Sequence, residues 1–333
     1  MTQRSEGSCS QQVQRSQKSQ RGPFETGDQV QLTDPKGRMH QIVLQPGGTF
    51  HTHRGSLRHD DLIGAPEGSV ITATSGTGYV ALRPLLADYT LAMKRGATIV
   101  YPKDAAQIIA YADVFPGARV LEAGAGSGAL SCWLLRALGP DGELVSFEAR
   151  SDFAEIARAN VSRFYGGDPP QWRLHTGELS AAAAGEPGSF DRVILDMVAP
   201  WECVAGAALA LIGGGLICCY VATTTQLSRI VEELRGHGGF FEPAAWETLV
   251  RGWHVDGLAV RPEHRMIGHT GFLVTARRLA AGVTSPPRRR RPAKGAHPEE
   301  AAAADQDPNT DQDPNTDRDI NADQDISASA DRA

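Results

Sequence analysis

The feature that most constrains this chain is a glycine-rich junction at residues 120–129, where an apolar run meets the start of a helical pattern. The junction reads Val-Leu-Glu-Ala-Gly-Ala-Gly-Ser-Gly-Ala, with glycine at every second position from 124 to 128. Glycines permit a sharp turn and a close approach of a ligand to the backbone, and the first N–H groups of the next helix can face that ligand. The junction therefore predicts a strand, a ligand-binding turn and a helix, in that order.

Apolar strands and helical stretches continue to alternate along the chain after this junction. We expect strands over residues 119–123, 143–148, 171–174, 190–196 and 216–221, and helices over 86–94, 104–114, 129–138 and 152–164. Such alternation is typical of a parallel sheet with helices on both faces, as in Rossmann-like α/β folds.

Residues 22–85 have a different pattern, with short alternating segments joined by turns. We expect one hairpin around the Asp-Pro-Lys-Gly turn at 34–37 and a second between 70–74 and 79–85. The chain therefore divides into a small all-β domain, 22–85, and an α/β domain, 86–281.

The two ends of the chain are polar. Residues 1–21 and 282–333 hold too few large apolar side chains to offset chain entropy, so we expect a disordered arm and a disordered low-complexity tail. The tail contains the basic run Arg288–Arg291, followed by a six-residue repeat. This run could add a salt-sensitive contact to RNA.

Composition excludes several classes of protein. No apolar run reaches the roughly 18 residues that a membrane span needs, and the N-terminus lacks a secretory pattern, so we expect a cytoplasmic protein without membrane contact. The five cysteines lack the spacing of a metal site, which predicts reduced thiols and no metal. A net charge of −6 argues against non-specific coating of nucleic acid.

Two carboxylates bear on the identity of the ligand. Gly124, Gly126 and Ala129 also satisfy the dinucleotide fingerprint, so an NAD(P)-dependent oxidoreductase is one alternative. Glu122 lies two residues before the first glycine, where it would repel a pyrophosphate but accept hydrogen bonds from an amino-acid ammonium. Glu148 ends the next strand, the position of a carboxylate that binds two ribose hydroxyls. Together they favour S-adenosylmethionine.

Asp196 is the candidate residue for substrate contact. It ends the fourth strand of the pattern, and a carboxylate at the carboxyl end of a parallel strand faces the ligand crevice. The alternative is that it caps the helix that Pro200 begins, but an Asp four residues earlier does this poorly.

Five segments carry a resemblance to a known family: residues 50–55, 101–105, 195–201, 268–270 and the glycine-rich junction. In order and spacing they look like the bacterial and archaeal tRNA (adenine-58-N1)-methyltransferases, most of all the actinobacterial members, over residues 22–281. The resemblance implies a class I S-adenosylmethionine-dependent methyltransferase domain, with a mostly parallel seven-stranded sheet, preceded by the small β domain. It also implies tRNA as the partner and a homotetramer.

The resemblance further implies roles for single residues. Gly124–Leu130 would surround the methionine and ribose of the cofactor, Glu148 would bind the ribose, Asp196 would contact the target adenine, and Tyr101 would line the base pocket. The family often has Asp where this chain has Glu178, near the cofactor's adenine, and Phe153 packs either on that adenine or in the core. The predicted cofactor-binding residues are thus Glu122, Gly124, Gly126, Ser127, Gly128, Ala129, Leu130, Glu148, Phe153, Glu178 and Asp196.

The expected reaction is methylation of N1 of an adenine that has been flipped out of its stack. Asp196 would accept a hydrogen bond from N6 as N1 attacks the sulfonium methyl. Arg54, Arg58, Lys94, Arg95 and Lys103 are candidates for phosphate contacts, and His51 and His53 for one polar or RNA-facing strand edge. A methyltransferase acting on a protein carboxylate or a small molecule is the second alternative.

Overall fold

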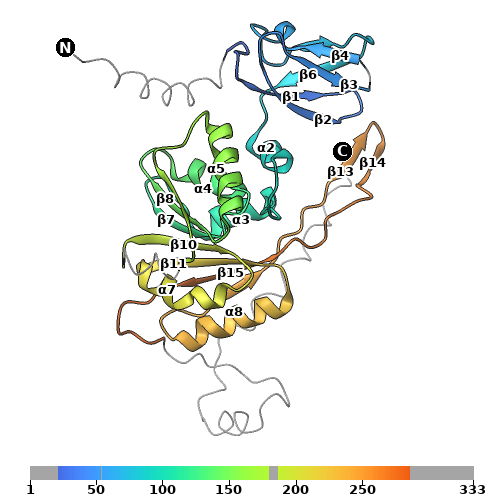
Figure 1. Cartoon of the computed structure of the whole chain (residues 1–333). Helices are drawn as coiled ribbons and strands as arrows, with labels where there is room; N and C mark the ends of the chain where they lie inside the picture. Colours follow the sequence, from blue (N-terminus) through green and yellow to red (C-terminus); the bar gives the residue numbers. More distant parts are fainter. Residues whose placement is uncertain (1–21, 54, 180–186, 286–333) are drawn as a thin grey trace, which may run out of the picture. The chain divides into compact units, whose positions relative to one another are not determined.

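The computed structural model describes residues 22–53, 55–179 and 187–285 (Figure 1). The predicted arm at 1–21, the Arg288–Arg291 run, the repeats of the tail and Arg54 lie outside the described residues. Among the described helices, none is long and apolar enough to cross a membrane.

The first part of the chain forms a small β structure. A four-stranded antiparallel sheet has the order β2 (Met39–Val43), β1 (Gln29–Thr33), β6 (Gly78–Leu82) and β5 (Val70–Thr72). Both predicted hairpins are present, as the pairs β1–β2 and β5–β6. A further hairpin joins β3 (Thr49–Thr52) to β4 (Gly55–Arg58). Alternate residues of the strands are buried, among them Val30, Leu32, Tyr79 and Ala81, so one face of the sheet covers a core.

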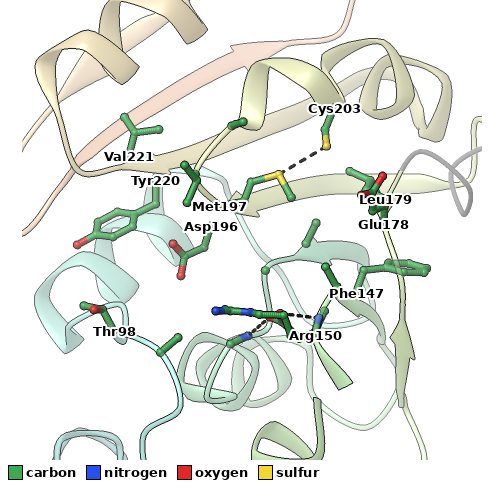
Figure 2. A pocket seen from close by; sticks show the side chains of 18 of the residues that line it. Thr98, Phe147, Arg150, Glu178, Leu179, Asp196, Met197, Cys203, Tyr220 and Val221 are labelled. Carbon is green, nitrogen blue, oxygen red and sulfur yellow. Dashed lines mark hydrogen bonds and ion pairs between the residues drawn. The ribbon is translucent and has the colours of Figure 1, made fainter. Parts of the chain in front are cut away.

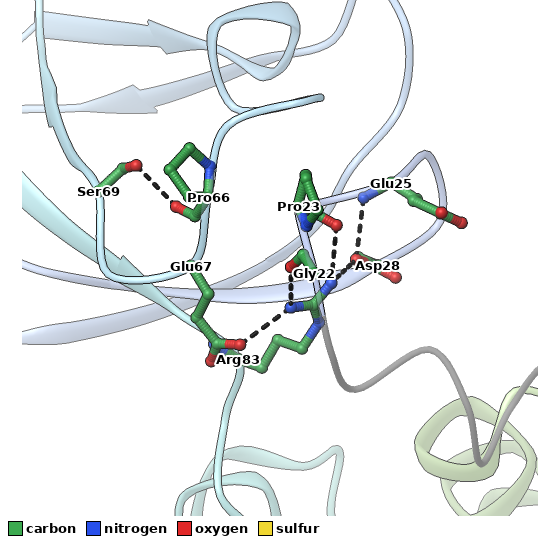
Figure 3. A network of polar contacts seen from close by, with 8 residues as sticks. All are labelled: Gly22, Pro23, Glu25, Asp28, Pro66, Glu67, Ser69 and Arg83. Atoms are coloured by element: carbon green, nitrogen blue, oxygen red, sulfur yellow. Dashed lines mark hydrogen bonds and ion pairs between the residues drawn. The ribbon is translucent and has the colours of Figure 1, made fainter.

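A single arginine ties the start of this β structure to its end (Figure 3). The Arg83 guanidinium donates to the carboxylates of Asp28 and Glu67, at 2.7 and 2.9 Å, and to the carbonyl oxygens of Gly22 and Pro23. The Arg83 side chain is 12% exposed. Because a planar guanidinium can serve several acceptors at once, Arg83 closes the segment between its first and last residues.

The second part is a seven-stranded sheet in the order β12-β15-β11-β10-β7-β8-β9. The strands are β7 (Arg119–Ala123), β8 (Glu143–Glu148), β9 (Trp172–Thr176), β10 (Phe190–Asp196), β11 (Leu211–Val221), β12 (Ala244–Trp246) and β15 (Phe272–Arg277). The five strands from β11 to β9 are parallel, whereas β15 pairs antiparallel with both of its neighbours, β11 and β12. The predicted fold, a mostly parallel seven-stranded sheet after a small β domain, is therefore confirmed.

Helices cover both faces of this sheet, and the strand residues alternate between two cores (Figure 1). On β10, Ile194 belongs to the core that also contains residues of α2 (Leu86–Ala92), α3 (Pro102–Tyr111), α4 (Ala129–Leu138) and α5 (Ser151–Tyr165). Its neighbours Val193 and Leu195 pack with α7 (Val204–Ala210) and α8 (Thr224–His237) on the other face. Strands buried on both faces explain why the sequence reads as continuous apolar runs.

Several boundaries differ from the sequence expectations. Helix α3 begins at Pro102 instead of residue 104, because proline fits the first helical position, where no N–H bond is needed. Tyr101 is therefore the N-cap of α3. Strand β11 begins at Leu211 instead of 216, and its pairing with β10 is irregular there, where three glycines follow one another. Strand β9 starts and ends later than predicted.

The segment between β12 and β15 spans residues 247–271. It contains an antiparallel hairpin of β13 (Trp253–Asp256) and β14 (Ala259–Pro262) that belongs to neither main sheet. One face of the hairpin carries Trp253, Val255 and Val260, which are 58, 69 and 57% exposed. Leu258, at the turn, is fully exposed. In the described structure this apolar face has no core of its own.

Candidate active site

A pocket of about 600 Å³ opens at the carboxyl ends of β7, β8, β10 and β11 (Figure 2). After β7 the chain adds β8 and β9 on one side of this strand and then β10 and β11 on its other side. The pocket therefore lies at the topological switch point of the sheet. Open α/β sheets bind their ligands at this place. The predicted residues on the pocket wall are Gly124, Gly126, Glu148, Glu178 and Asp196.

The glycine-rich turn lies where two strand ends come close. A Cβ on Gly124 would lie 1.8 Å from the carbonyl oxygen of Asp196, so no other residue fits without a shift of β7 or β10. The backbone φ of Gly124 is +89°, in the region that favours glycine. Gly128 is the N-cap of α4, and a Cβ there would meet the backbone of Ala157 at 3.0 Å. The glycines thus allow strand, turn and helix to pack around one end of the pocket.

Glu148 connects this turn to the end of β8. Its Oε2 accepts a hydrogen bond from the Gly126 N–H at 2.8 Å, and its Oε1 accepts from the backbone N–H and Nε of Arg150, at 3.1 and 3.2 Å. The Arg150 guanidinium also lies over the Phe153 ring, 3.4 Å from its centre. These hydrogen bonds to both oxygens hold the Glu148 carboxylate in one orientation at the pocket wall.

Asp196 is the last residue of β10, and its carboxyl points into the cavity (Figure 2). The structure shows no hydrogen bond to this side chain from any described residue. Burial, together with the nearby carboxylates of Glu122 and Glu148, raises the pKa of Asp196 to about 7. An unpaired carboxyl with a pKa near neutrality, at the edge of a cavity, is typical of a functional group.

Glu122 lies behind the pocket wall instead of on it. Its side chain is fully buried, and Oε2 accepts hydrogen bonds from the hydroxyls of Ser131, at 2.7 Å, and Ser146, at 2.5 Å. Its Oε1 has no partner among the described residues. Burial raises the pKa of Glu122. Oε1 of Glu122 is therefore a buried oxygen beside the glycine turn. It can accept a hydrogen bond when the carboxyl is ionised and can donate one when it is protonated.

The remaining predicted residues also lie away from the pocket wall. The Ser127 hydroxyl accepts hydrogen bonds from the backbone N–H groups of Gly96 and Ala97 and so shapes the loop before α3. Ala129 and Leu130 are core residues of α4. Phe153 packs beside Gly96, where a Cβ would lie 3.2 Å from its ring. Tyr101, the N-cap of α3, is half-buried.

Other pocket residues were not predicted from the sequence. They include Gln226 and, labelled in Figure 2, Thr98, Phe147, Met197, Cys203 and Tyr220. Tyr220 is the register partner of Asp196 on the neighbouring strand. Because the carboxyl ends of parallel strands share one edge, the reasoning that selected Asp196 would also have selected Tyr220 at the end of the predicted strand 216–221.

Two sequence expectations for polar side chains are wrong. Lys103 was a candidate for a phosphate contact, but its side chain is 13% exposed and its Nζ pairs with Asp104 at 2.7 Å. His51 and His53 were placed on one strand face, but β3 ends at Thr52, and His53 lies in the turn, near Arg38. Among the described residues no cluster of three metal-ligating side chains occurs.

The pocket fits a cationic cofactor. Glu148 and Asp196 bring two carboxyl groups to its wall, and the unpartnered Oε1 of Glu122 lies behind it. A sulfonium and an ammonium group would be attracted by this set, whereas a pyrophosphate would be repelled. The fold and the pocket together define a Rossmann-like methyltransferase of the S-adenosylmethionine-dependent class.

Comparison with solved structures gives the same class. The chain resembles an S-adenosylmethionine-dependent O-methyltransferase from Thermotoga maritima, with a TM-score of 0.73 and 29% identity, over 80% of this chain and 96% of the other. It also resembles the tRNA (m1A58) methyltransferase TrmI from Aquifex aeolicus, with a TM-score of 0.68 and 27% identity, over 78% of this chain and 99% of the other.

Sequence comparison identifies the family. Residues 22–71 match the TrmI-like N-terminal model, and residues 78–260 match the model of the tRNA methyltransferase complex GCD14 subunit. The chain is 38% identical to the tRNA (adenine(58)-N(1))-methyltransferase TrmI of Thermus thermophilus, over 75% of this chain and 96% of the relative. It is 30% identical to the tRNA (adenine(57)-N(1)/adenine(58)-N(1))-methyltransferase TrmI of Methanocaldococcus jannaschii, over 74 and 93%. The chain therefore belongs to the GCD14/TrmI family of tRNA methyltransferases.

Proposed function

We propose that this protein transfers a methyl group from S-adenosylmethionine to N1 of adenine 58 in the T-loop of tRNA. Relatives that match nearly their whole length to this chain carry the name of this activity. The observation that carries the proposal is the Asp196 carboxyl, which faces the pocket without a hydrogen-bond partner among the described residues. An adenine N6 amino group is a donor that would satisfy it.

The base must enter the pocket flipped out of its stack, because N1 lies on the pairing edge. When bound, S-adenosylmethionine supplies an electrophilic methyl group on sulfur. Asp196 accepts a hydrogen bond from N6, which orients N1 and stabilises the positive charge that develops on the ring as N1 attacks. Tyr220 provides aromatic surface on the substrate side. The methyl group passes directly to N1, so the reaction needs no covalent intermediate with the protein.

The residues for the cofactor lie on the other side of Asp196. Glu148 would bind the ribose hydroxyls with its carboxylate, after Arg150 releases Oε1. Gly124 and Gly126 would contact the methionine part through their backbones, and Glu122 would orient its ammonium from behind the wall. Glu178, which lines the pocket, would face the cofactor's adenine.

Two alternatives are disfavoured by the same carboxyl groups. A protein carboxylate as methyl acceptor would be repelled by Asp196 above pH 7. A dinucleotide would bring its pyrophosphate to the glycine turn, beside Glu148 and above Glu122. For an adenine acceptor, in contrast, each of these groups has a role.

We further propose a cytoplasmic homotetramer. The exposed apolar face of the β13–β14 hairpin supports self-assembly, because an isolated two-stranded hairpin is only marginally stable in water. Replacing Trp253 and Val255 by Ser should reduce the mass measured by light scattering, while His254→Gln, on the opposite face of the same strand, should not. An unchanged mass in the double variant would show that the hairpin does not contribute to the contacts between subunits.

The activity is tested with transcripts that lack modified bases. Purified protein, S-adenosylmethionine and an unmodified tRNA should yield 1-methyladenosine at position 58, detected by mass spectrometry of nuclease digests. A transcript with guanine at position 58 is the matched control and should remain unmethylated. Transfer of methyl groups to another position, or to protein alone, would contradict the proposal.

A further inference from the structure

A buried ion pair lies next to the substrate side of the pocket and has no role in the proposed chemistry. Asp104, in the first turn of α3, has a side chain that is 1% exposed. Its Oδ1 accepts a hydrogen bond from Lys103 Nζ at 2.7 Å. Breaking a buried pair leaves an uncompensated charge, so such pairs are retained only where they are well satisfied.

The second oxygen of Asp104 is used to hold the pocket wall. Oδ2 accepts a hydrogen bond from the Thr270 hydroxyl at 2.6 Å and a longer one from the Tyr220 hydroxyl at 3.4 Å. Thr270 and Tyr220 both line the pocket. The Asp104 carboxylate itself is absent from the pocket wall, so it acts through these two side chains and not on a ligand.

Lys103 joins more distant segments to the same point. Besides Asp104, its Nζ donates to the Thr270 hydroxyl at 2.6 Å and to the carbonyl oxygen of Thr248 at 2.7 Å. The start of α3, the residues just after β12 and the residues just before β15 therefore meet at one ammonium group. All three donors of Lys103 have acceptors, which is the complete set for an ammonium.

The Tyr220 ring is also fixed from its other side. A Cβ on Gly271 would lie 2.4 Å from Tyr220 Cζ and 2.7 Å from its hydroxyl oxygen. The φ of Gly271 is not in the region reserved for glycine, so the reason for glycine there is space for the ring. Tyr220 is thus held between the backbone at 271 and the carboxylate of Asp104, with Asp196 beside it on β10 (Figure 2).

We infer that Asp104 is a positioning residue for the substrate side of this site. Supported by Lys103, it fixes the Tyr220 ring and hydroxyl at the angle that confines the target base against Asp196. The inference rests on the proposed function, since it assigns the base to the side of the pocket formed by Tyr220 and Thr270. A misplacement of about 1 Å at such a wall lowers a rate by on the order of 100-fold.

The test is a double-mutant cycle on the single-turnover methylation rate, with saturating tRNA and cofactor. Asp104→Asn should lower the rate about 10- to 100-fold, and Tyr220→Phe, which removes the hydroxyl that Asp104 holds, should lower it as well. If Asp104 acts through Tyr220, the double variant is no slower than the slower single variant. The Kd for S-adenosylmethionine should change less than threefold in all three.

Asp34→Asn is the matched control. The Asp34 side chain is also 1% exposed and pairs with an arginine, Arg38, but it lies in the β structure. This variant should lose thermal stability and keep the methylation rate. Independent, multiplicative losses in the cycle, or equal losses of rate in Asp34→Asn and Asp104→Asn, would show that Asp104 is only structural.

Gly271→Ala tests the same wall without altering any charge, should Asp104→Asn fail to fold. The added methyl group must displace the Tyr220 ring, so the rate should fall at least tenfold while cofactor affinity is kept. A wild-type rate in Gly271→Ala would overturn the inference. These outcomes are distinct from failure of the proposed function, in which the wild-type protein itself would not methylate tRNA.

Discussion

Asp196 and Tyr220 are register partners at the carboxyl ends of the parallel strands β10 and β11. This pairing brings a carboxyl group without a hydrogen-bond partner among the described residues next to an aromatic ring that is fixed by Asp104 and Gly271. Asp196 therefore offers the pocket a hydrogen-bond acceptor, and Tyr220 offers it a flat aromatic surface. This combination suits a planar base with an amino group on its edge.

Asp196→Asn should lower the single-turnover methylation rate by about two to four orders of magnitude, because the amide is neutral and a poorer acceptor for N6. Cofactor affinity should change little, since Glu148 carries the ribose contact. Asp191→Asn, near the opposite end of the same strand, is the control, and its carboxylate accepts a hydrogen bond from the Arg119 N–H outside the pocket. A near-normal rate in Asp196→Asn would remove this residue from the reaction.

The methylation rate should depend on the ionisation of Asp196. The pKa of this group is raised to about 7 by burial and by neighbouring carboxylates, so kcat/KM should rise with pH up to about 7 and level off above it. The sign for stability is opposite. The folded protein binds the proton more tightly than the unfolded chain, so the free energy of unfolding falls between about pH 4 and pH 7.

Both pH effects are measured against Asp196→Asn. The variant should lack the rise in kcat/KM, and its free energy of unfolding, from urea titrations at a series of pH values, should fall less over the same interval. An identical pH dependence in the two proteins would assign the titration to another group.

Glu148→Ala should weaken the binding of S-adenosylmethionine by about 1.5–3 kcal/mol, the usual contribution of hydrogen bonds to a charged group. Glu143→Ala, at the start of the same strand, removes a carboxylate that pairs with Arg119 and Arg173 and should leave the Kd unchanged. Calorimetric titration provides the measurement. Equal affinities for Glu148→Ala and the wild type would place the ribose elsewhere.

Gly124→Ala should destabilise the fold far more than Gly126→Ala. Both residues have positive φ angles, which costs an alanine about 1–2 kcal/mol. At Gly126 the nearest atom is 3.5 Å from the added Cβ, whereas at Gly124 the carbonyl of Asp196 is at 1.8 Å. We expect a loss above about 3 kcal/mol for Gly124→Ala in denaturant titrations. Equal losses would contradict the close approach of β7 and β10.

Much of this architecture could be predicted from local patterns. The bounds of β7, β8, β10 and α4 agree with the apolar runs, because strands buried on both faces need continuous apolar residues. The glycine turn and the position of Asp196 followed from the rule that ligands bind at the carboxyl ends of parallel strands. The β13–β14 hairpin was missed, because its exposed residues show no burial pattern.

The sequence by itself determined the order of strands and helices from α2 to β10, the glycine turn and the two carboxylates, Glu148 and Asp196, on the pocket wall. Tertiary structure decided which side chains meet there. Strand order in the sheet, which no local pattern encodes, made Tyr220 the neighbour of Asp196. Packing of α4 and β8 buried Glu122 behind the wall with Ser131 and Ser146. Contacts between residues far apart in the chain therefore determined the final arrangement, and burial at those contacts altered the acidity of the carboxyl groups.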